Sequence, residues 1–487
     1  MIVKFGREGI LKDQVTQGSM VRPTAVVGLG CSGISAARLL HAQGHRVWLL
    51  EQRQTPQLQS TAAALRQEGL HVQLDCALTF LKLLNPQAVV LSPGVGWAEP
   101  VLVQLRRRGV PVYGETELAW QTMKTMTSAP WIGVTGTNGK TTITAMVSHL
   151  LLQAGRDAPI CGNSGAAATE LALDCHGGRR PDWVVAELSS FQIEASPTIA
   201  PRIGIWSTLT PDHLDRHGSL TAYGAIKAAL VTCSAIPVLN GDDPQIWRRR
   251  NRWPTARWVT CRGGSVLQPH RQAALSIEEG MVTALSGPLF SADILPLPGQ
   301  HNRINMLLAT AAALETGLEP GQIAAGLRSF PGVPHRLETI ARHQGVTYIN
   351  DSKATNYDAA RIALEALDGP LVLLAGGRGK QGDAHGWLEG IAARAAAVIC
   401  YGEAGDGFAV QVQQACPRIV CQRLPGLREA VPRSHALALE HGAATVLLSP
   451  ACASFDQYPN FEVRGEHFRA LVQALGKAQS SPTAGAR

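Results

Sequence analysis

A glycine-rich segment at residues 133–142 restricts the possible folds of this chain more than any other feature of the sequence. It reads Gly-Val-Thr-Gly-Thr-Asn-Gly-Lys-Thr-Thr, begins within an apolar run at 131–135 and leads into a helical pattern from Lys140. Glycines between a strand and a helix let backbone N–H groups turn toward phosphate oxygens, and the helix N-terminus adds a favourable dipole. The segment therefore predicts a parallel α/β sheet that binds the phosphates of a nucleoside triphosphate.

The segment departs from the strict phosphate-loop pattern at one position, because Val134 stands where that pattern has glycine. A glycine-rich turn that arose by chance is the alternative interpretation, but the Lys-Thr-Thr after Gly139 favours phosphate binding. Lys140 can reach the terminal phosphates, and the hydroxyl of Thr141 or Thr142 can bind Mg²⁺. The residues expected to hold ATP are Gly136, Thr137, Asn138, Gly139, Lys140, Thr141 and Thr142.

Strand-like apolar runs alternate with helical stretches almost throughout, which is the pattern of parallel α/β sheets. At 487 residues the chain is long enough for about three domains. A polar stretch at 121–130 is expected to be a linker, and Pro331-Gly-Val-Pro334 marks a second boundary. The predicted ranges are 21–120 for the N-terminal domain, 121–332 for the central domain and 333–476 for the C-terminal domain, with a disordered extension at 1–20 and a disordered tail at 477–487.

The strands of the three domains are expected where short apolar runs occur. Residues 256–297 are less regular and are expected to form a small antiparallel piece, and a helix rich in Ala and Leu is expected at 302–318. The expected strands lie at 24–30, 45–51 and 88–92, then at 131–135, 183–187 and 203–206, and finally at 346–350, 371–375, 397–400 and 445–449.

Composition limits the partners and the compartment. The formal charge is +7, but the basic runs at 106–108 and 248–252 have few aromatic neighbours, so we interpret them as solvated surface and expect no nucleic-acid partner. The 10 cysteines include no Cys-x-x-Cys pair, which argues against structural zinc and for a reducing cytosol. Residues 1–20 lack the apolar core of a secretory signal, and no run of about 18 apolar residues exists. We therefore expect a cytoplasmic protein with no membrane partner.

Acidic residues follow two of the central strands. Glu187 ends one strand, where a carboxylate can face the phosphate loop and complete an oxygen-rich Mg²⁺ shell, although a buried structural role is the alternative. Asp212, His213 and Asp215 crowd the end of the next strand, which suits a second metal or an acid/base role. Lys227 is a single lysine on an otherwise apolar helix, and such a side chain usually extends to solvent.

A second glycine motif, Gly28-Leu-Gly-Cys-Ser-Gly33, follows the first strand and opens a helix, and Glu51 ends the next strand. This spacing is typical of a dinucleotide fold, so NAD, FAD or a nucleotide-sugar diphosphate would fit. An oxidoreductase would also need a hydride-transfer site, for which the sequence has no coherent set of residues, and it would leave the phosphate loop unexplained.

Several segments together resemble the Mur ligases, ATP-dependent enzymes that extend the peptide of peptidoglycan precursors. The resemblance runs from about residue 21 to residue 475, with the motifs in family order. The motifs are Gly136-Thr-Asn-Gly-Lys-Thr-Thr142, Glu187-Leu-Ser-Ser-Phe-Gln192, Asp212-His213, Lys227, Gly299-Gln-His-Asn302 with Asn305, Pro334-His-Arg336, Asn350-Asp-Ser-Lys-Ala-Thr-Asn356, and Ser449-Pro-Ala-Cys-Ala-Ser-Phe-Asp456 with Asn460-Phe461.

The resemblance implies a Rossmann-like N-terminal sheet, a central P-loop-type ATPase sheet and a Rossmann-like C-terminal sheet. It implies a monomeric ligase that uses ATP to join D-glutamate to UDP-N-acetylmuramoyl-L-alanine through an acyl phosphate. Because an acyl phosphate hydrolyses in water, we expect the domains to close over it, with the linkers near Met123 and Gly332 as hinges. The implied UDP-sugar contacts are Gly30, Cys31, Ser32, Glu51, Gln52, Arg53, Ser92, Asn163 and Ser189. Relatives often have an acidic residue followed by a hydroxyl where this chain has Glu51-Gln52.

The resemblance also implies the remaining site residues. Lys140, His213 and Lys227 would be catalytic, with Lys227 carbamylated by CO₂. Two Mg²⁺ ions would be held by Thr141, Glu187, His213 and Lys227. Further ATP contacts would come from Asn302, Asn305, Arg336 and Asp351. The D-glutamate pocket would comprise Lys353, Thr355, Lys380, Ser454 and Phe461.

Two other hypotheses stay open at this point. A different Mur ligase or a folylpolyglutamate-type synthase would keep the chemistry and change the amino acid. A nucleotide binder without ligase activity, such as an oxidoreductase, would use the Gly28 motif instead.

Overall fold

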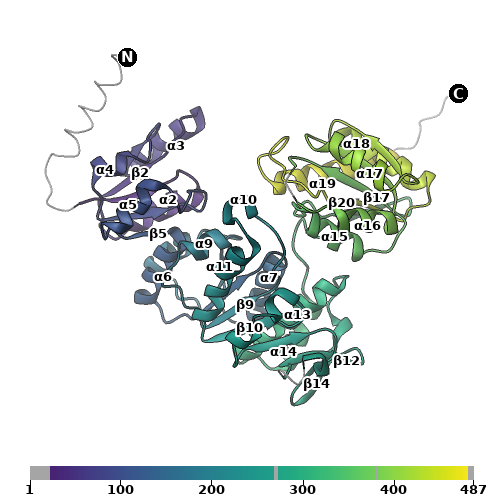
Figure 1. The fold of residues 1–487 in the computed structure, drawn as a ribbon, viewed down its shortest axis with the longest axis horizontal. Coiled ribbons are helices and arrows are strands. Elements are labelled where there is room, and N and C mark those ends of the chain that lie inside the picture. The colour runs from purple at the N-terminus through teal and green to yellow at the C-terminus, as the bar shows by residue number, and fades with distance from the viewer. Residues whose placement is uncertain (1–21, 268–271, 380–381, 481–487) are drawn as a thin grey trace.

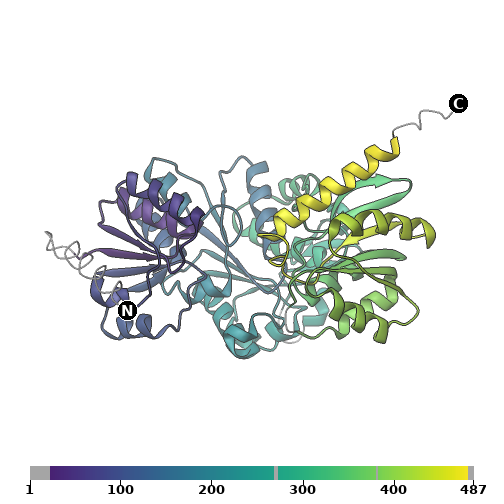
Figure 2. The same ribbon diagram turned by 90° about the horizontal axis from the view of Figure 1, so that it is seen from above.

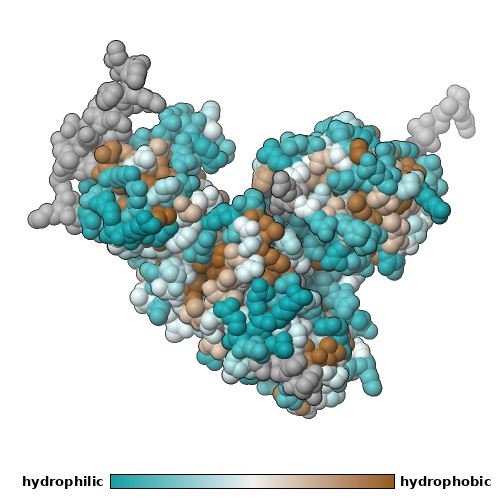
Figure 3. Space-filling view, in the orientation of Figure 1, coloured by the Kyte–Doolittle hydropathy of each residue, from teal (hydrophilic) through white to brown (hydrophobic). Residues whose placement is uncertain are grey.

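The computed structural model describes residues 22–267, 272–379 and 382–480 and places them in three α/β lobes (Figure 1). Each lobe is built on one sheet, of five, nine and six strands in chain order. The three-sheet α/β architecture predicted from the alternating apolar runs is confirmed, while the domain boundaries stay predictions. A notch separates the N-terminal lobe from the C-terminal lobe (Figure 3). Apolar residues gather on the surface of the middle lobe on this face of the molecule (Figure 3).

The N-terminal lobe contains a wholly parallel sheet in the order β3-β2-β1-β4-β5. Apolar clusters cover both faces of this sheet, which is why its strands read as continuous apolar runs. Its strands are β1 (Thr24–Val27), β2 (Val47–Leu50), β3 (His71–Gln73), β4 (Ala88–Leu91) and β5 (Val112–Gly114), and its helices are α2 (Cys31–Ala42), α3 (Pro56–Gln67), α4 (Phe80–Leu84), α5 (Pro100–Arg107) and α6 (Glu115–Met126).

The middle lobe has its strands in the order β14-β13-β12-β11-β10-β9-β6-β8-β7. The strands from β7 to β12 pair in parallel, and β12, β13 and β14 pair antiparallel, which confirms the small antiparallel piece predicted at 256–297. The strands are β6 (Trp131–Thr135), β7 (Ile160–Gly162), β8 (Val184–Glu187), β9 (Ile203–Trp206), β10 (Ile236–Asn240), β11 (Arg257–Thr260), β12 (Leu275–Glu278), β13 (Met281–Ala284) and β14 (Gly287–Ser291).

The helices of the middle lobe connect these strands and cover the sheet. The longest, α13, carries the Ala- and Leu-rich pattern predicted at 302–318 and begins two residues earlier, after Gly299. The helices are α7 (Lys140–Gln153), α8 (Ala168–His176), α9 (Ser190–Glu194), α10 (Leu214–His217), α11 (Leu220–Cys233), α12 (Pro244–Trp247), α13 (Gln300–Glu315) and α14 (Pro320–Arg328).

The C-terminal lobe has a sheet in the order β15-β16-β20-β17-β18-β19, in which only the β15–β16 pair is antiparallel among the described residues. The last helix, α19, lies across this lobe (Figure 2). The elements are β15 (Glu338–His343), β16 (Val346–Asn350), α15 (Tyr357–Glu365), β17 (Leu371–Gly376), α16 (His385–Arg394), β18 (Ala395–Tyr401), α17 (Gly405–Ala415), β19 (Val420–Arg423), α18 (Leu427–Glu440), β20 (Thr445–Leu448) and α19 (Phe461–Ser480).

The N-terminal and middle lobes share one hydrophobic core. Side chains of α2 and α6 pack with Leu171 and Ala172 of α8 in a single buried cluster. Two buried carboxylates of α6 add hydrogen bonds across the junction: Glu115 accepts from Thr169 N at 2.6 Å, and Glu117 accepts from Thr198 N at 3.1 Å. A buried polar group that is left without its hydrogen-bond partner costs free energy. These bonds therefore oppose separation of the two lobes, as the apolar contact does. The two lobes therefore form one packed unit.

This shared core corrects the predicted linker at 121–130. Residues 121–126 form the last turns of α6, and Met123, expected near a hinge, is only 1% exposed in the common cluster. Gln121, Lys124 and Thr125 lie on the exposed side of this amphipathic helix, whereas Thr122 and Met123 are buried. Composition alone does not distinguish such a helix from a linker. The predicted hinge at Met123 is wrong, and the one at Gly332 stays a prediction.

The C-terminal end differs slightly from the prediction. The tail was placed from residue 477, but α19 continues to Ser480, and residues 481–487 lie outside the described part of the chain, as does the predicted extension at 1–20. No helix within the described ranges is long and apolar enough to cross a membrane.

The shared core gives a test of the corrected linker. We expect Met123→Ala to lower the free energy of unfolding by about 2–5 kcal/mol, because it removes a fully buried side chain and leaves a cavity. Urea unfolding followed by tryptophan fluorescence measures this change. Lys124→Ala, on the exposed side of the same helix, is the control and should change stability by less than about 0.5 kcal/mol. Equal, small effects of both substitutions would restore the linker interpretation.

Candidate active site

The predicted phosphate loop lies between β6 and α7 and is shaped by two glycines. Gly139 caps α7 with φ +84°, and Gly136 has φ +148°, both in a region that side chains other than glycine rarely adopt. A Cβ at Gly136 would lie 2.0 Å from Ser207 Oγ, and one at Gly139 would lie 2.6 Å from Asn305 Oδ1. The glycines therefore allow the loop to pass close to the segment after β9 and to α13.

Hydrogen bonds from the segment after β9 hold this loop in place. Thr137 N donates to Thr208 O at 2.9 Å, Asn138 N donates to Thr208 Oγ1 at 2.9 Å, and Thr137 Oγ1 donates to Thr210 O at 3.0 Å. The Ser207 hydroxyl also donates to Asn138 O. The same segment continues into Asp212, so the predicted metal residues directly follow the residues that hold the phosphate loop.

Lys140 lies at the start of α7 with its ammonium group turned onto its own loop. Its Nζ donates to Gly136 O at 3.0 Å and to Thr137 O at 2.8 Å. Its enclosed position lowers its pKa, although the carboxylates of Glu187 and Asp212 oppose that effect. A lysine that caps loop carbonyls in this way can exchange them for phosphate oxygens.

Glu187 ends β8 and faces the loop, as the sequence predicted. It is 1% exposed; Oε1 accepts from Asn163 Nδ2 at 2.8 Å, while Oε2 is buried without a hydrogen-bond partner. Burial alone would raise its pKa, but Lys140, Lys353 and the side chains of Asn163 and Thr141 outweigh burial and keep the pKa below its usual range. Glu187 is thus a buried anion whose Oε2 accepts no hydrogen bond. Such a carboxylate oxygen is a suitable ligand for a cation.

Lys227 does not extend to solvent, so the usual expectation for a lysine on an apolar helix is wrong here. It is 1% exposed on α11, and its Nζ donates to Gly136 O at 2.9 Å and lies 4.6 Å from the centre of the Tyr223 ring. Burial, with repulsion from Lys140, lowers its pKa well below the ordinary value. Lys227 is buried because it lies on the inner side of α11. The sequence pattern does not show which side of that helix faces inward.

His213 follows the loop-holding segment at the mouth of the site. It has φ +53° as the residue before α10, and its Nε2 lies 3.6 Å from Asp212 Oδ2. Its ring stands edge-on to Phe191 of α9, 5.2 Å between centres. Among the described residues, no group of three or more His, Cys, Asp and Glu side chains forms a metal site by itself.

The predicted ATP contacts beyond the loop come from two lobes. Asn302 and Asn305 of α13 are buried, with Asn305 against the loop. Arg336 precedes β15 and has a buried Nε with no partner, which suits an anionic ligand. Asp351 follows β16; burial raises its pKa to about 7, and its carboxylate accepts from Ser449 Oγ at 2.8 Å and Leu337 N at 3.2 Å. Asp351 thus connects the segment before β15 with the segment after β20 inside the C-terminal lobe.

The predicted amino-acid pocket lies at the ends of C-terminal strands. Lys353 follows β16, and its Nζ is 5.0 Å from the centre of the Phe461 ring; burial lowers its pKa to about 8, although Glu187 opposes that shift. Ser454 is buried in the segment after β20, and Thr355 is half-buried before α15. Lys380 lies outside the described residues. The structure thus places Lys353 of the C-terminal lobe near Glu187 of the middle lobe.

The N-terminal glycine motif forms the turn between β1 and α2. Glu51 is buried at the end of β2 and accepts from Leu29 N at 2.9 Å and Arg53 N at 3.0 Å. Burial would raise its pKa, but these N–H groups and the Arg53 guanidinium keep the pKa below normal. Of the other predicted contacts, Cys31, Gln52 and Arg53 are exposed, and Gly30 caps α2.

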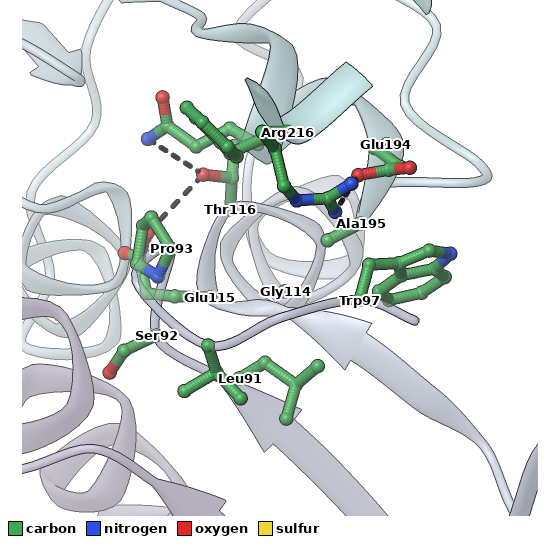
Figure 4. A pocket seen from close by; sticks show the side chains of 13 residues that line it. Leu91, Ser92, Pro93, Trp97, Gly114, Glu115, Thr116, Glu194, Ala195 and Arg216 are labelled. Carbon is green, nitrogen blue, oxygen red and sulfur yellow. Dashed lines mark hydrogen bonds and ion pairs between the residues drawn. The ribbon is translucent and has the colours of Figure 1, made fainter. Parts of the chain in front are cut away.

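A pocket lies between the N-terminal sheet and α9 (Figure 4). Ser92, a predicted UDP-sugar contact, lines it, together with Trp97 and with Arg216, which is paired with Glu194 at 2.6 Å. Asn163 and Ser189 lie outside its lining: Asn163 holds Glu187, and Ser189 caps α9. The lining also includes Phe191 and Gln192, which belong to the motif that begins with Glu187.

Asp358 of α15 is a contact that the sequence did not reveal. Its Oδ2 accepts from Asn138 Nδ2 at 2.6 Å and from Thr210 Oγ1 at 2.8 Å, while Oδ1 pairs with Arg361 at 2.8 Å. One carboxylate of the C-terminal lobe therefore binds both the phosphate loop and the segment that holds it. Only its position next to the Asn350–Asn356 motif could have drawn attention to it.

Removal of this carboxylate should loosen the C-terminal lobe. We expect Asp358→Ala to shift the ligand-free lobes about tenfold toward open arrangements, since hydrogen bonds to a charged group are lost. Energy transfer between dyes on the middle and C-terminal lobes measures the shift. Glu365→Ala is the matched control, because Glu365 also binds Arg361 on α15 but does not reach the phosphate loop. An unchanged distance distribution in Asp358→Ala would show that the contact does not hold the lobes.

Three family descriptions match this chain in order. Residues 22–114 match the Mur ligase MurD-like N-terminal domain, residues 134–313 the Mur ligase middle domain, and residues 335–452 the Mur ligase glutamate ligase domain. The chain belongs to the Mur ligase family.

The chain is also similar over nearly its whole length to named relatives. A UDP-N-acetylmuramoylalanine--D-glutamate ligase from Synechococcus sp. (strain CC9605) is 50% identical over 460 residues, which covers 93% of this chain and 98% of the relative. The enzyme of the same name from Synechocystis sp. (strain ATCC 27184 / PCC 6803 / Kazusa) is 46% identical over 453 residues, which covers 92% of this chain and 99% of the relative.

Solved structures support the fold. UDP-N-acetylmuramate-alanine ligase MurC from Thermotoga maritima matches with a TM-score of 0.58 at 19% identity, covering 93% of this chain and 99% of that one. Mycobacterium tuberculosis folylpolyglutamate synthase, solved with ADP, matches with a TM-score of 0.55 at 15% identity, covering 71% of this chain and 93% of that one. At these identities the likeness concerns architecture alone.

Proposed function

We propose that this chain is an ATP-dependent ligase that joins D-glutamate to UDP-N-acetylmuramoyl-L-alanine in cytoplasmic peptidoglycan precursor synthesis, and that it acts as a monomer. The observation that carries the proposal is the meeting of two lobes at Glu187, where Lys140 of the phosphate loop and Lys353 of the C-terminal lobe both act on one carboxylate. Phosphates held by the first and an amino acid held by the second would lie side by side. The names of the relatives supply the substrate class.

The reaction needs ATP because a carboxylate does not accept an amine directly. The alanyl carboxylate attacks the γ-phosphoryl group, so that ADP leaves and an acyl phosphate forms. Lys140, released from the loop carbonyls, neutralises charge on the transferred phosphoryl oxygens. The neutral amine of D-glutamate then attacks the acyl carbon, the C–O bond to phosphate breaks, and phosphate leaves with the proton that the nitrogen gives up. Closure of the C-terminal lobe excludes the water that would hydrolyse the acyl phosphate.

The residues at Glu187 fit a bound Mg²⁺. The carboxylate has one buried oxygen without a partner, and the hydroxyl of Thr141 lies beside it. When bound, Mg²⁺ supplies positive charge that polarises phosphoryl oxygens. We expect Thr141, Glu187, His213 and Lys227 to hold the two ions that the family resemblance implies, with phosphate and water oxygens completing each shell.

Carbamylation of Lys227 is the second part of the metal proposal. A neutral lysine amine adds to CO₂ to form an N–C bond with loss of one proton, and burial beside Lys140 favours that neutral amine. The product is an anion, which removes the repulsion between two neighbouring ammonium groups and provides oxygen ligands. The contact of the unmodified Lys227 with Gly136 O supports a position for this anion beside the phosphate loop.

The amino acid is expected to bind at Lys353, Thr355, Ser454 and Phe461, with Lys380 from the undescribed segment. Lys353 carries a positive charge that attracts a carboxylate of D-glutamate, and each charge-assisted hydrogen bond contributes about 1.5–3 kcal/mol. On the opposite side, the turn at the Gly28 motif, together with Ser92, would bind the sugar nucleotide with its alanyl end toward Glu187.

An amino-acid panel tests the proposed function. Purified protein with ATP, Mg²⁺ and UDP-N-acetylmuramoyl-L-alanine should form one new amide with D-glutamate, detected by product mass, and release one ADP for each. L-glutamate, meso-diaminopimelate and L-lysine are the controls. Preference for one of these, or equally fast ADP release without the muramoyl substrate, would contradict the proposal.

Lys227 gives a test of the carbamate. We expect Lys227→Ala to lose most activity and to regain part of it with added formate, acetate or propionate, because a small carboxylate can replace the carbamate in the cavity. The measurement is ADP release against acid concentration. Lys140→Ala is the control and should not respond, since it loses a cation. If Lys227→Ala shows no rescue at any acid concentration, Lys227 acts as an amine or has a structural role.

A further inference from the structure

We propose that Arg464 is the positioning residue of the amino-acid pocket: it fixes the pocket's three supporting segments without touching the substrate. This inference rests on the proposed function for the location of that pocket. Arg464 lies one turn into α19, is 0% exposed and ranks among the largest fully buried side chains of the described chain. A buried guanidinium is costly unless its donors are satisfied.

The donors of Arg464 reach three separate segments. Nε donates to Ser352 Oγ at 3.0 Å and Nη2 donates to Ser352 O at 2.8 Å, both after β16. Nη2 also donates to Cys452 O at 3.1 Å, after β20, and Nη1 donates to Gly376 O at 3.4 Å, at the end of β17. Because β16, β20 and β17 are neighbours in the sheet, one side chain spans the carboxyl ends of three adjacent strands.

Two of these segments, and helix α19 itself, carry residues of the expected pocket. Lys353 directly follows Ser352, Ser454 lies two residues after Cys452, and Phe461 lies three residues before Arg464 on α19. The Ser352 hydroxyl, which accepts from Arg464, donates in turn to Phe461 O at 2.8 Å. The guanidinium therefore sets the relative positions of pocket groups that are about a hundred residues apart in sequence.

The backbone around Arg464 is adapted to this side chain. Gly377 has φ +132°, and a Cβ there would lie 3.0 Å from Arg464 Nη1 and 2.3 Å from Ala453 O. Arg378 N donates to Ala453 O at 2.8 Å, which joins the segments after β17 and β20 beside the guanidinium. Glycine at 377 is thus the only residue that leaves room for both contacts.

The groups that accept hydrogen bonds from Arg464 indicate that this residue positions the chain and does not serve as the partner of a carboxylate. All four hydrogen bonds end on carbonyl or hydroxyl oxygens, and none of the ion pairs among the described residues includes Arg464. Arginine suits this arrangement because its planar fork presents five donors in fixed directions, whereas the donors of lysine radiate from one nitrogen. Arg464→Lys would keep the charge and lose the simultaneous contact with three segments.

Steady-state kinetics of Arg464→Lys in the full-length chain test the proposal. We expect the KM for D-glutamate to rise on the order of tenfold or more, since small displacements of substrate-holding groups have large effects, while the KM for ATP and for the muramoyl substrate changes less than about twofold. Arg469→Lys is the matched control: it lies on the same helix but pairs with Glu338 and Glu466, away from the pocket, and should leave all three KM values unchanged.

A purely structural role predicts a different pattern. Partial unfolding would lower kcat in proportion to the folded fraction and leave the KM for D-glutamate unchanged, and that result would overturn the proposal. If Arg464→Lys does not fold, Ser352→Ala removes the hydroxyl between Arg464 and Phe461 and should raise the same KM selectively. If the wild-type chain takes another amino acid, the proposed function fails, and the KM for that amino acid decides the role of Arg464.

Discussion

The excess of positive charge around the buried carboxylate of Glu187 is the interaction on which the rest of the site depends. Glu187 is surrounded by Lys140, Lys227 and Lys353, and Arg336 adds to the field. Burial would favour neutral lysines and a protonated acid, yet the mutual attraction keeps Glu187 ionised while the lysine pKa values fall. The site gains stability when anions enter it. A triphosphate, a carbamate and a dicarboxylic amino acid are all anions, so the proposed ligands share one electrostatic requirement.

The packing of the lobes decides how such ligands can be brought together. The N-terminal and middle lobes share a core and buried hydrogen bonds, so the turn at the Gly28 motif has a fixed position relative to the phosphate loop. The C-terminal lobe meets the phosphate loop through polar contacts such as that of Asp358, which water can replace at modest cost. Motion is therefore expected between the C-terminal lobe and the other two, and it would carry Lys353 toward or away from Glu187.

Sequence patterns located the parts of the site that are local along the chain. The phosphate loop needs glycines and a lysine between one strand and one helix, and those letters are adjacent from Gly133 to Thr142. Glu187 could be placed because strand ends in a parallel sheet meet at one edge. Asp358 and Arg464 could not be found in this way, because their partners lie on distant segments and neither belongs to a periodic or spaced motif. The linker at 121–130 was misplaced for a related reason: α6 buries its apolar side against another lobe, which composition does not show.

The sequence by itself determined that three mainly parallel α/β sheets follow one another and that the second carries a phosphate loop, because the strand and helix periods and the glycine positions are local properties. It did not determine that Lys227 is buried, that α6 unites two lobes, or that one guanidinium spans three strand ends. Those features arise from tertiary contacts, where burial changes the cost of a charge and brings residues far apart in sequence within hydrogen-bonding distance. Phosphate binding could thus be predicted from residues that are adjacent in sequence. The buried charges and hydrogen bonds around the phosphate loop could be seen only in the folded chain.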